Sequence, residues 1–480
     1  MRRLLTKTRG HADYHLLLFL FIISFVSVYF IPEMFNRVIF LIILVAAYRT
    51  KLDYVYLVWF FIISDAPGRL FSSGSLEATA RIPLYPVVSG VSIGFMELFI
   101  IVYLIKYLKS KKPKRFIFKK EFTWYLAFGI VMAAFSMLLN MSFANVIGTY
   151  RHLLPWFLVF VIPVFINDKN TLIKTSKLVF PVVILAFASQ LQSYFTGDYL
   201  NNILQGSVSG RLEIGEEASR SYSAVIITLF SLIQAFYFLF NRKTEMNRNY
   251  LGIIVFLGYF TIIMSAMRGW IIALSAILLG IMIFFGFQKG NMKIVRLVVV
   301  SAIAFYLIQL QFPLVTKQLD ASIERFATME ALVHGDVTAG GTLQRLDIRG
   351  PRVMKKFWES PVMGFGFSDE FYYYSDGHVG NQNILLNVGI LGYLFLIGVF
   401  IRISVKIWKI SGRMEFRIGE NRAPLVYLFG LIAVFIIHST SGQFWGYTIS
   451  DKSIIFFAFF MAAINAVYLS RQILTKKSDI

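Results

Sequence analysis

A histidine, an aspartate and two asparagines stand where a polar stretch of the chain becomes an apolar one, in "SDGHVGNQNILLNVGILG" (375–392). An imidazole exchanges a proton near neutral pH, so His378 could serve as a general base. The amides of Asn381 and Asn383 could bind a polar substrate. The competing interpretation is that these side chains only satisfy the first turn of the helix that begins here.

Arginines gather in three other stretches. Arg211 and Arg220 flank "RLEIGEEASR", and Arg268 lies in "MSAMRGW". Arg345, Arg349 and Arg352 lie in "QRLDIRGPR". Arginine holds phosphate through two parallel hydrogen bonds, so these residues suggest a site for an anionic headgroup or a lipid-linked diphosphate. Each arginine could instead anchor the chain at a membrane interface or pair with a nearby acid. That alternative is weakest for Arg268, because no acid is close to it in the sequence.

Several other kinds of site have no counterpart in the sequence. The chain has no cysteine, which excludes disulfides, thiolate metal sites and a cysteine nucleophile. Among the histidines expected on the outer side, His152, His334, His378 and His438, no pair has metal-ligand spacing, and the sequence has no Asp-x-Asp pair, phosphate-binding P-loop or serine nucleophile elbow. We therefore expect neither a metal nor a cofactor.

Composition identifies the elements that must position these residues. The chain is 57% hydrophobic and 15% charged, whereas a soluble protein carries about 25% charged residues. Its apolar residues fall in long blocks, and blocks of about 17–25 apolar residues are typical of transmembrane helices. The sequence therefore predicts an all-α polytopic membrane protein, with a single transmembrane domain over 1–480 and about 12–14 spans. The fourteen candidate spans lie near 15–31, 36–48, 52–64, 91–107, 122–140, 152–166, 178–195, 221–240, 250–266, 270–287, 297–312, 381–401, 424–440 and 452–469.

The distribution of positive charge predicts the orientation of these spans. Alternate connections, together with both tails, hold 32 of the 47 Lys and Arg residues, and positive connections stay in the cytoplasm. Both termini are therefore expected inside, with the first apolar block an uncleaved signal-anchor. The net charge of +21 is then explained by topology and contact with anionic lipid, not by nucleic acid. The largest outer connection is 313–380, whose apolar spacing suits an amphipathic helix in an ordered extracytoplasmic loop.

Three stretches in order resemble the O-antigen ligase and polymerase family of bacterial membrane glycosyltransferases. They are "TIIMSAMRGWIIALSAILLG" (261–280), "RLDIRGPRVMKKFWESPVMGFGF" (345–367), and His378 followed by "GILG" (389–392). The likeness covers about residues 200 to 400. This chain has Met267-Arg268 and His378-Val379 where the family often has Ser-Arg and His-Asn. Either Asn381 takes the role of that asparagine, or His378 is not the histidine that matches the family's.

The resemblance implies a helical fold related to the GT-C glycosyltransferases in the bacterial cytoplasmic membrane. It implies that a glycan on undecaprenyl diphosphate is transferred, without a metal, to a sugar or lipid-linked glycan acceptor at the outer face. His378, Arg268 and Arg345 would then be catalytic. Arg211, Arg220, Arg349, Asn381 and Asn383 would bind the substrate. The sequence does not separate a polymerase from a ligase, although the family's divergent members favour a polymerase, and it says nothing of the oligomeric state.

A transporter, in particular a lipid-linked oligosaccharide flippase, is the main alternative, because such carriers also have twelve to fourteen spans. Alternating-access carriers tend to consist of paired halves. Here one long outer connection lies only in the C-terminal half, which favours the enzyme. A structural or sensory membrane protein is a weaker third possibility.

The charge distribution makes a direct prediction about topology. A reporter enzyme fused after Lys120 should be active in the cytoplasm, and one inserted within 330–340 should be active only outside, because basic connections are retained inside. Cytoplasmic activity from the 330–340 fusion would place the candidate residues on the wrong side and remove the basis for an outer site.

Overall fold

The computed structural model describes most of the chain, in ten ranges. These are 2–71, 83–88, 91–139, 141–205, 223–241, 245–265, 267–286, 348–412, 423–440 and 444–478. The expected span near 297–312, the expected amphipathic part of the outer loop before 348, and Arg211, Arg220 and Arg345 lie outside these ranges. Arg268 begins a described helix, although its side chain is not described.

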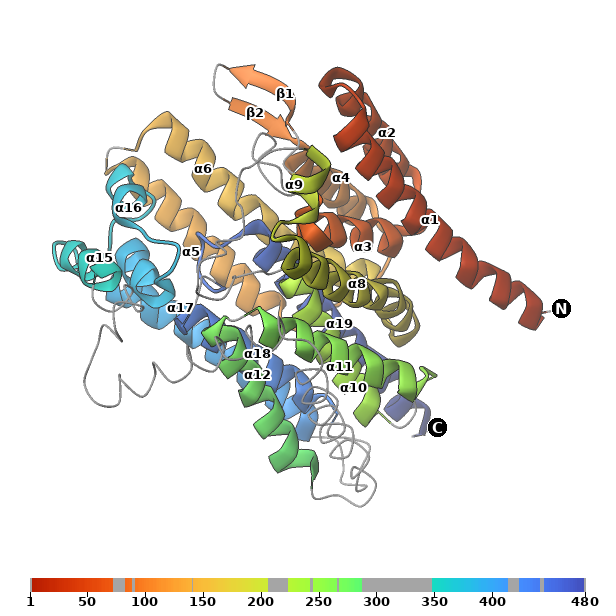
Figure 1. Cartoon of the computed structure of the whole chain (residues 1–480). Helices are drawn as coiled ribbons and strands as arrows, with labels where there is room; N and C mark the ends of the chain where they lie inside the picture. The colour runs from red at the N-terminus through yellow and green to blue at the C-terminus, as the bar shows by residue number, and fades with distance from the viewer. Residues whose placement is uncertain are drawn as a thin grey trace.

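Helices make up nearly all of the described structure (Figure 1). In the N-terminal half they are α1 (Arg2–Phe30), α2 (Glu33–Arg49), α3 (Asp53–Ser64), α4 (Phe95–Lys109), α5 (Lys119–Met137), α6 (Phe143–Leu153), α7 (Leu158–Phe165), α8 (Lys169–Thr196) and α9 (Leu200–Gln205), with short 3-10 turns η1 (Pro67–Arg69) and η2 (Leu154–Phe157). In the C-terminal half they are α10 (Val225–Phe240), α11 (Arg248–Met264), α12 (Arg268–Ile281), a π-helical turn η3 (Met282–Gly286), α15 (Gly350–Phe357), α16 (Asp369–Tyr374), α17 (Gly380–Gly412), α18 (Leu425–Thr440) and α19 (Asp451–Ser478). One antiparallel hairpin, β1 (Pro83–Val88) and β2 (Val91–Gly94), interrupts the all-α pattern within a connection expected outside.

Five of the described helical segments are long and apolar enough to cross a membrane. They are Ala12–Phe30, Phe143–Phe165, Lys169–Thr196, Gly380–Ser411 and Asp451–Ser470. Five more apolar segments are shorter, namely Asp53–Ser64, Val225–Phe240, Arg248–Met264, Gly269–Phe285 and Leu425–Thr440. The expectation of an α-helical membrane protein is confirmed, and the number of crossings stays a prediction.

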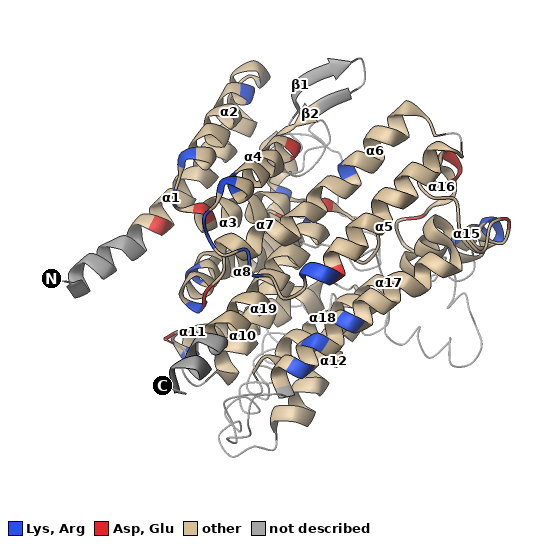
Figure 2. Cartoon of the chain, turned by 180° about the vertical axis from the view of Figure 1, so that it is seen from behind, with Lys and Arg blue, Asp and Glu red and all other residues tan. Residues whose placement is uncertain are grey.

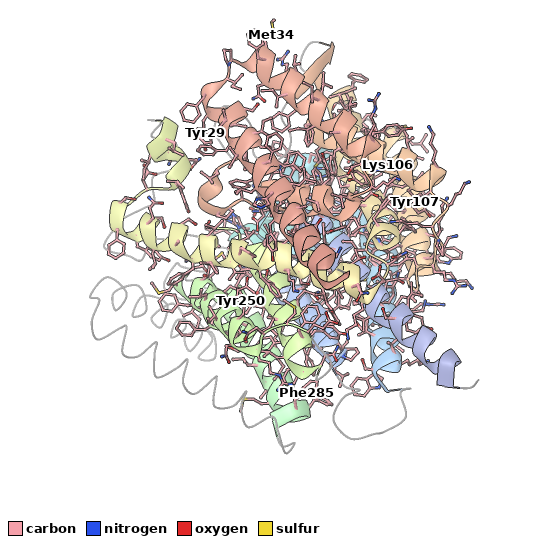
Figure 3. The ribbon with its side chains drawn as sticks, turned by 90° about the vertical axis from the view of Figure 1, so that its right-hand side faces the viewer. Tyr29, Met34, Lys106, Tyr107, Tyr250 and Phe285 are labelled. Atoms are coloured by element: carbon pink, nitrogen blue, oxygen red, sulfur yellow. The ribbon has the colours of Figure 1, made fainter. Side chains whose placement is uncertain are left out.

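Burial follows the apolar pattern of each helix. Every residue of α3 is buried, as expected for a helix that is apolar on all sides and lies inside a bundle. In contrast, α1 and α2 expose large apolar side chains, including Phe19 at 59% and Phe35 at 57%. Met34, at the turn between these two helices, points away from the molecule (Figure 3). These outer helices have the apolar surface that a lipid environment requires.

The two ends of the chain lie on the same side of the molecule, away from α15, α16 and the hairpin (Figure 1). The basic residues of α17 lie in the half of that helix that is far from α15 (Figure 2). Two of them, Arg402 and Lys406, pair with the buried Glu121 near the start of α5, at 2.9 and 2.7 Å. The side of the membrane on which the termini and the basic connections lie stays a prediction.

Helix α17 is broken at Gly389, whose φ of 68° and ψ of −175° are not helical. A continuous helix would bond the N–H groups of residues 390 and 391 to the carbonyls of residues 386 and 387. The 361–366 segment, which follows α15, occupies the break and takes up these groups. The bonds run from Ile390 N–H to the Pro361 carbonyl (2.8 Å), Leu391 N–H to the Val362 carbonyl (3.4 Å), Phe365 N–H to the Leu386 carbonyl (2.8 Å) and Gly366 N–H to the Asn387 carbonyl (2.7 Å).

Two glycines allow this close approach. A Cβ on Gly389 would lie 2.2 Å from the Val362 carbonyl oxygen, and one on Gly364 would lie 2.5 Å from the Gly389 nitrogen. Both residues have positive φ, which side chains disfavour. Glycines of the second and third sequence stretches thus pack against each other's backbone and hold α15 against α17.

Substitution at the break should destabilise the protein. Gly389→Ala adds a methyl group against backbone and forces a glycine-only conformation, with a cost of at least about 1–3 kcal/mol. The matched control is Gly398→Ala in the same helix, where a Cβ meets nothing within 4 Å. In detergent, the unfolding midpoint should fall for Gly389→Ala and stay level or rise for Gly398→Ala. Equal midpoints would contradict the role given to the break.

Candidate functional site

An open pocket of about 550 Å³ lies between the start of α15 and the turn that precedes α17. Its lining residues are Ile348, Arg349, Arg352, Ser375, Asp376, Gly377 and His378. Two of the residues singled out from the sequence, Arg349 and His378, therefore line one pocket although 29 positions separate them. The His378 side chain is exposed to this space.

Asp376 lies between the two arginines of the pocket. Its Oδ1 is 3.6 Å from Arg349 Nη1, and its Oδ2 is 3.6 Å from Arg352 Nη2. Arg349 and Arg352 are three positions apart at the start of a helix, which places both on one face. The pocket thus presents two guanidinium groups around a single carboxylate, and retains an excess of positive charge.

The turn that carries His378 is held by side-chain and backbone hydrogen bonds. Asp376 Oδ1 accepts the His378 N–H at 2.9 Å, and the Asp376 carbonyl accepts the Val379 N–H at 3.2 Å. One turn into α17, the buried Asn383 accepts the Asp376 N–H at 3.0 Å and donates its amide to the Asp376 carbonyl. Asn383 therefore positions the turn from behind, and does not line the pocket.

Apolar packing fixes α15 against this turn. A separate small core of buried side chains joins the two elements, and it consists of Val353, Phe357, Phe371, Val379 and Leu386. Beside it, Lys356 pairs with Glu359 and Glu370 at 2.6 Å each. Partial desolvation lowers the pKa of Lys356, but the hydrogen bonds and charges of the two glutamates outweigh it and raise the pKa overall. Lys356 is thus a structural cation, unlike the pocket arginines.

Helix α16 ties the pocket region to the N-terminal half of the protein. Asp369 Oδ1 accepts the Ser142 N–H at 2.8 Å and the Asn145 side-chain amide at 2.6 Å. The Ser142 backbone and the Asn145 side chain together lower the pKa of Asp369. The Tyr372 hydroxyl is 3.2 Å from Thr149 Oγ1 on α6. These contacts hold α16, and with it the turn to α17, beside α6 and the connection between α5 and α6.

Asn381 does not line the pocket either. Its side-chain amide donates to Ser439 Oγ at 3.0 Å, so it joins the start of α17 to the end of α18. His438 is buried beside it, and its Nδ1 accepts the Phe444 and Trp445 N–H groups at 3.1 and 3.2 Å. That histidine organises the connection after α18.

The stretch around Arg268 comes to the same end of the bundle. Trp270, two residues into α12, packs edge-on against Phe444 with ring centroids 5.6 Å apart. The Phe444 N–H donates a hydrogen bond to His438 Nδ1. Gly380, at the start of α17, packs so closely on His438 that a Cβ there would lie 2.3 Å from the His438 carbonyl oxygen. The helix starts of the first and third sequence stretches are therefore linked through the end of α18.

Sequence reasoning identified part of this pocket. It assigned site roles to Arg349 and His378. It also assigned substrate binding to Asn381 and Asn383, whose side chains contact Ser439 and the Asp376 backbone. It noted Arg352 among the clustered arginines and Asp376 beside His378, but gave neither a role in the site. The i, i+3 spacing of Arg349 and Arg352 was a readable signal for the first, whereas nothing local pairs Asp376 with residues 24 and 27 positions earlier.

The other histidines and possible metal ligands contribute little to the pocket. His152 stacks on Tyr372 with ring centroids 6.5 Å apart, and His334 lies outside the described residues. In the part of the chain that the structure describes, no three His, Asp or Glu side chains come together as possible metal ligands.

The pocket should bind a diphosphate group through its arginines. A hydrogen bond to a charged group contributes about 1.5–3 kcal/mol, so Arg349→Ala and Arg352→Ala should each weaken binding of inorganic diphosphate about tenfold or more. Lys355→Ala is the matched control, because Lys355 is exposed on the same helix and does not line the pocket. Titration calorimetry in detergent measures all three. Equal weakening by the control would indicate attraction to general surface charge.

No protein-family model matches the chain, and no curated protein sequence matches it. The functional argument therefore depends on the residues and geometry of the pocket itself.

Proposed function

We propose that the protein transfers a glycan from undecaprenyl diphosphate to the hydroxyl group of an acceptor sugar, at the outer face of the bacterial cytoplasmic membrane. The single observation that carries this proposal is the pocket shared by Arg349, Arg352 and His378 at the mouth of α17. It combines cations suited to a diphosphate with a group suited to take a proton. The likeness of three sequence stretches to the O-antigen ligase and polymerase family supports the same activity.

The reaction requires two kinds of assistance, and the pocket offers both. The acceptor oxygen attacks the anomeric carbon, the bond from that carbon to the diphosphate oxygen breaks, and the lipid diphosphate leaves with the bonding electrons. Guanidinium groups stabilise the negative charge that develops on the leaving group. His378 takes the proton that the acceptor hydroxyl loses. Arg268 and Arg345 would add further positive charge from the neighbouring stretches.

Asp376 has a different role in this proposal. Both of its oxygens are engaged by guanidinium groups, and one also accepts the His378 N–H. It therefore orients the arginines and the histidine-bearing turn. Because the two ion pairs are long, at 3.6 Å each, phosphate oxygens can compete with the carboxylate for the same N–H groups. A diphosphate would then enter a pocket whose cations are already positioned.

The acceptor decides whether the enzyme is a polymerase or a ligase. A polymerase joins the growing glycan to another lipid-linked repeat unit, and a ligase joins it to a terminal acceptor. One donor pocket serves both reactions, and we favour a polymerase on the basis of the family resemblance. No described contact favours a flippase.

The role of His378 can be tested separately from donor binding. General-base assistance is worth about 10²–10⁴-fold in rate, so His378→Ala should lower turnover by that order, while inorganic diphosphate still binds because the arginines remain. His378→Gln retains a hydrogen-bond donor but no base, and should be equally slow. Turnover is measured as polymer formed by the purified protein in proteoliposomes containing lipid-linked repeat units.

Asn381→Ala serves as the control, because it changes the same helix start without touching the pocket lining. Polymer of normal length and amount from His378→Ala would exclude His378 as the general base. Movement of lipid-linked oligosaccharide across the bilayer with no new glycosidic bond would show that the protein is a carrier and not an enzyme.

A further inference from the structure

The 358–363 segment exposes an apolar surface beside the pocket. Trp358 is 65% exposed, Val362 55% and Met363 43%. These residues follow α15, and the Val362 carbonyl is itself hydrogen-bonded into the break of α17. Two exposed residues of α17 next to the break, Leu391 at 58% and Leu394 at 61%, extend the same apolar surface along that helix.

This surface is continuous with the membrane-facing side of α17. The Val362 carbonyl accepts the Leu391 N–H at 3.4 Å, so the two residues are at the same height along the helix. Leu391 and Leu394 belong to the apolar segment Gly380–Ser411, which is long enough to cross a membrane. Any lipid that covers these leucines therefore also meets Val362.

The height of the segment can be derived from the basic end of α17. Arg402, whose side chain is 64% exposed, pairs with Glu121 beside Lys119 and Lys120, and marks one membrane interface. Gly389 precedes it by 13 residues, which at about 1.5 Å per residue is about 20 Å. The hydrocarbon layer is about 30 Å thick. The break, and Val362 with it, lies about 10 Å inside the opposite boundary by these figures, and a tilt of α17 only places it deeper.

The residues on either side of the apolar surface fit this placement. Arg352 and Lys355 are exposed about two turns and one turn before the 358–363 segment begins, and cations at the height of lipid headgroups meet anionic phosphate. Trp358 follows them, and indole rings favour the boundary between headgroups and hydrocarbon. Glu359 comes next, and its carboxylate is compensated by an ion pair with Lys356 at 2.6 Å. Val362 and Met363 are the apolar side chains that follow.

We propose that the 358–363 segment is inserted in the outer leaflet, with lipid acyl chains as its partner, and that it fixes the pocket at the level of the lipid headgroups. Irregular backbone at this depth is tolerated only where protein satisfies its hydrogen bonds. The four bonds to the break in α17 do so for Pro361, Val362, Phe365 and Gly366. This inference needs only a membrane-embedded chain and is independent of the proposed activity.

The absence of cysteine allows a direct test, because each single-cysteine variant takes one spin label. Trp358→Cys, Val362→Cys and Met363→Cys are labelled in bilayers of phosphatidylethanolamine and phosphatidylglycerol. Collision with oxygen, which concentrates in hydrocarbon, is compared with collision with a water-soluble nickel chelate. Leu391→Cys is the lipid reference. Gly377→Cys is the water reference, because a Cβ there meets nothing within 4 Å and the residue lines the open pocket.

Labels at residues 362 and 363 should collide with oxygen several-fold more than with the nickel chelate, as at residue 391. The label at residue 358 should be shallower, and that at residue 377 should favour nickel. Accessibility of both the 362 and 363 labels to nickel would overturn the proposal. Shielding from both reagents with spin–spin broadening would also overturn it, in favour of a second copy of the chain. The two positions are independent, so loss of folding in one variant leaves the other decisive.

Discussion

The exchange of backbone hydrogen bonds at the break of α17 is the constraint on which the candidate site depends. A helix interrupted within a membrane exposes N–H and C=O groups that no water can satisfy. Here the groups of residues 386, 387, 390 and 391 are taken up by the 361–366 segment. Inside a membrane, neither the broken helix α17 nor the 361–366 segment would be stable without the other. Because the segment follows α15, this pairing also fixes where α15 stands relative to the start of α17.

The pocket is a consequence of that placement. Arg349 and Arg352 are carried by the start of α15, whereas Asp376 and His378 are carried by the turn before α17. Once the two elements are held together, the carboxylate lies between the guanidinium groups, and the turn is braced from behind by Asn383. The two ion pairs alone would stabilise this arrangement only weakly, because solvent-exposed ion pairs contribute little to stability. Backbone pairing and the small apolar core beneath α15 supply the rigidity, and the charges are left to bind a ligand.

The same arrangement bears on how the proposed anion site could lie beside a membrane. Trp358 and Val362, between α15 and the end of the segment that closes the break, are exposed, and the pocket arginines stand about two turns before Trp358 along the chain. The groups proposed to bind an anion and those proposed to face lipid are therefore parts of one short structure. A substrate with a diphosphate headgroup and a long lipid tail could then contact the arginines with its headgroup and the exposed apolar residues with its tail.

The sequence by itself determined the class of the protein and the approximate location of the site. Long apolar blocks predict a helical membrane protein because the requirement acts on each block separately, and the polar turn at His378 is readable because it interrupts such a block. Arg349 could also be singled out from the sequence, because the positive-inside rule does not account for an arginine in a connection expected outside.

Only the tertiary structure decided how these parts meet. Apolar periodicity describes neighbours within one helix, so it predicted an unbroken span over 381–401, and it did not predict that the Asn383 side chain binds the Asp376 backbone. The partner of the Ile390 N–H is Pro361, 29 positions earlier, and the partner of Asp376 is Arg349, 27 positions earlier. A backbone donor has no side-chain signature, and a lone aspartate in a polar turn has no preferred partner. Such pairings follow from the packing of whole helices, which no local pattern records.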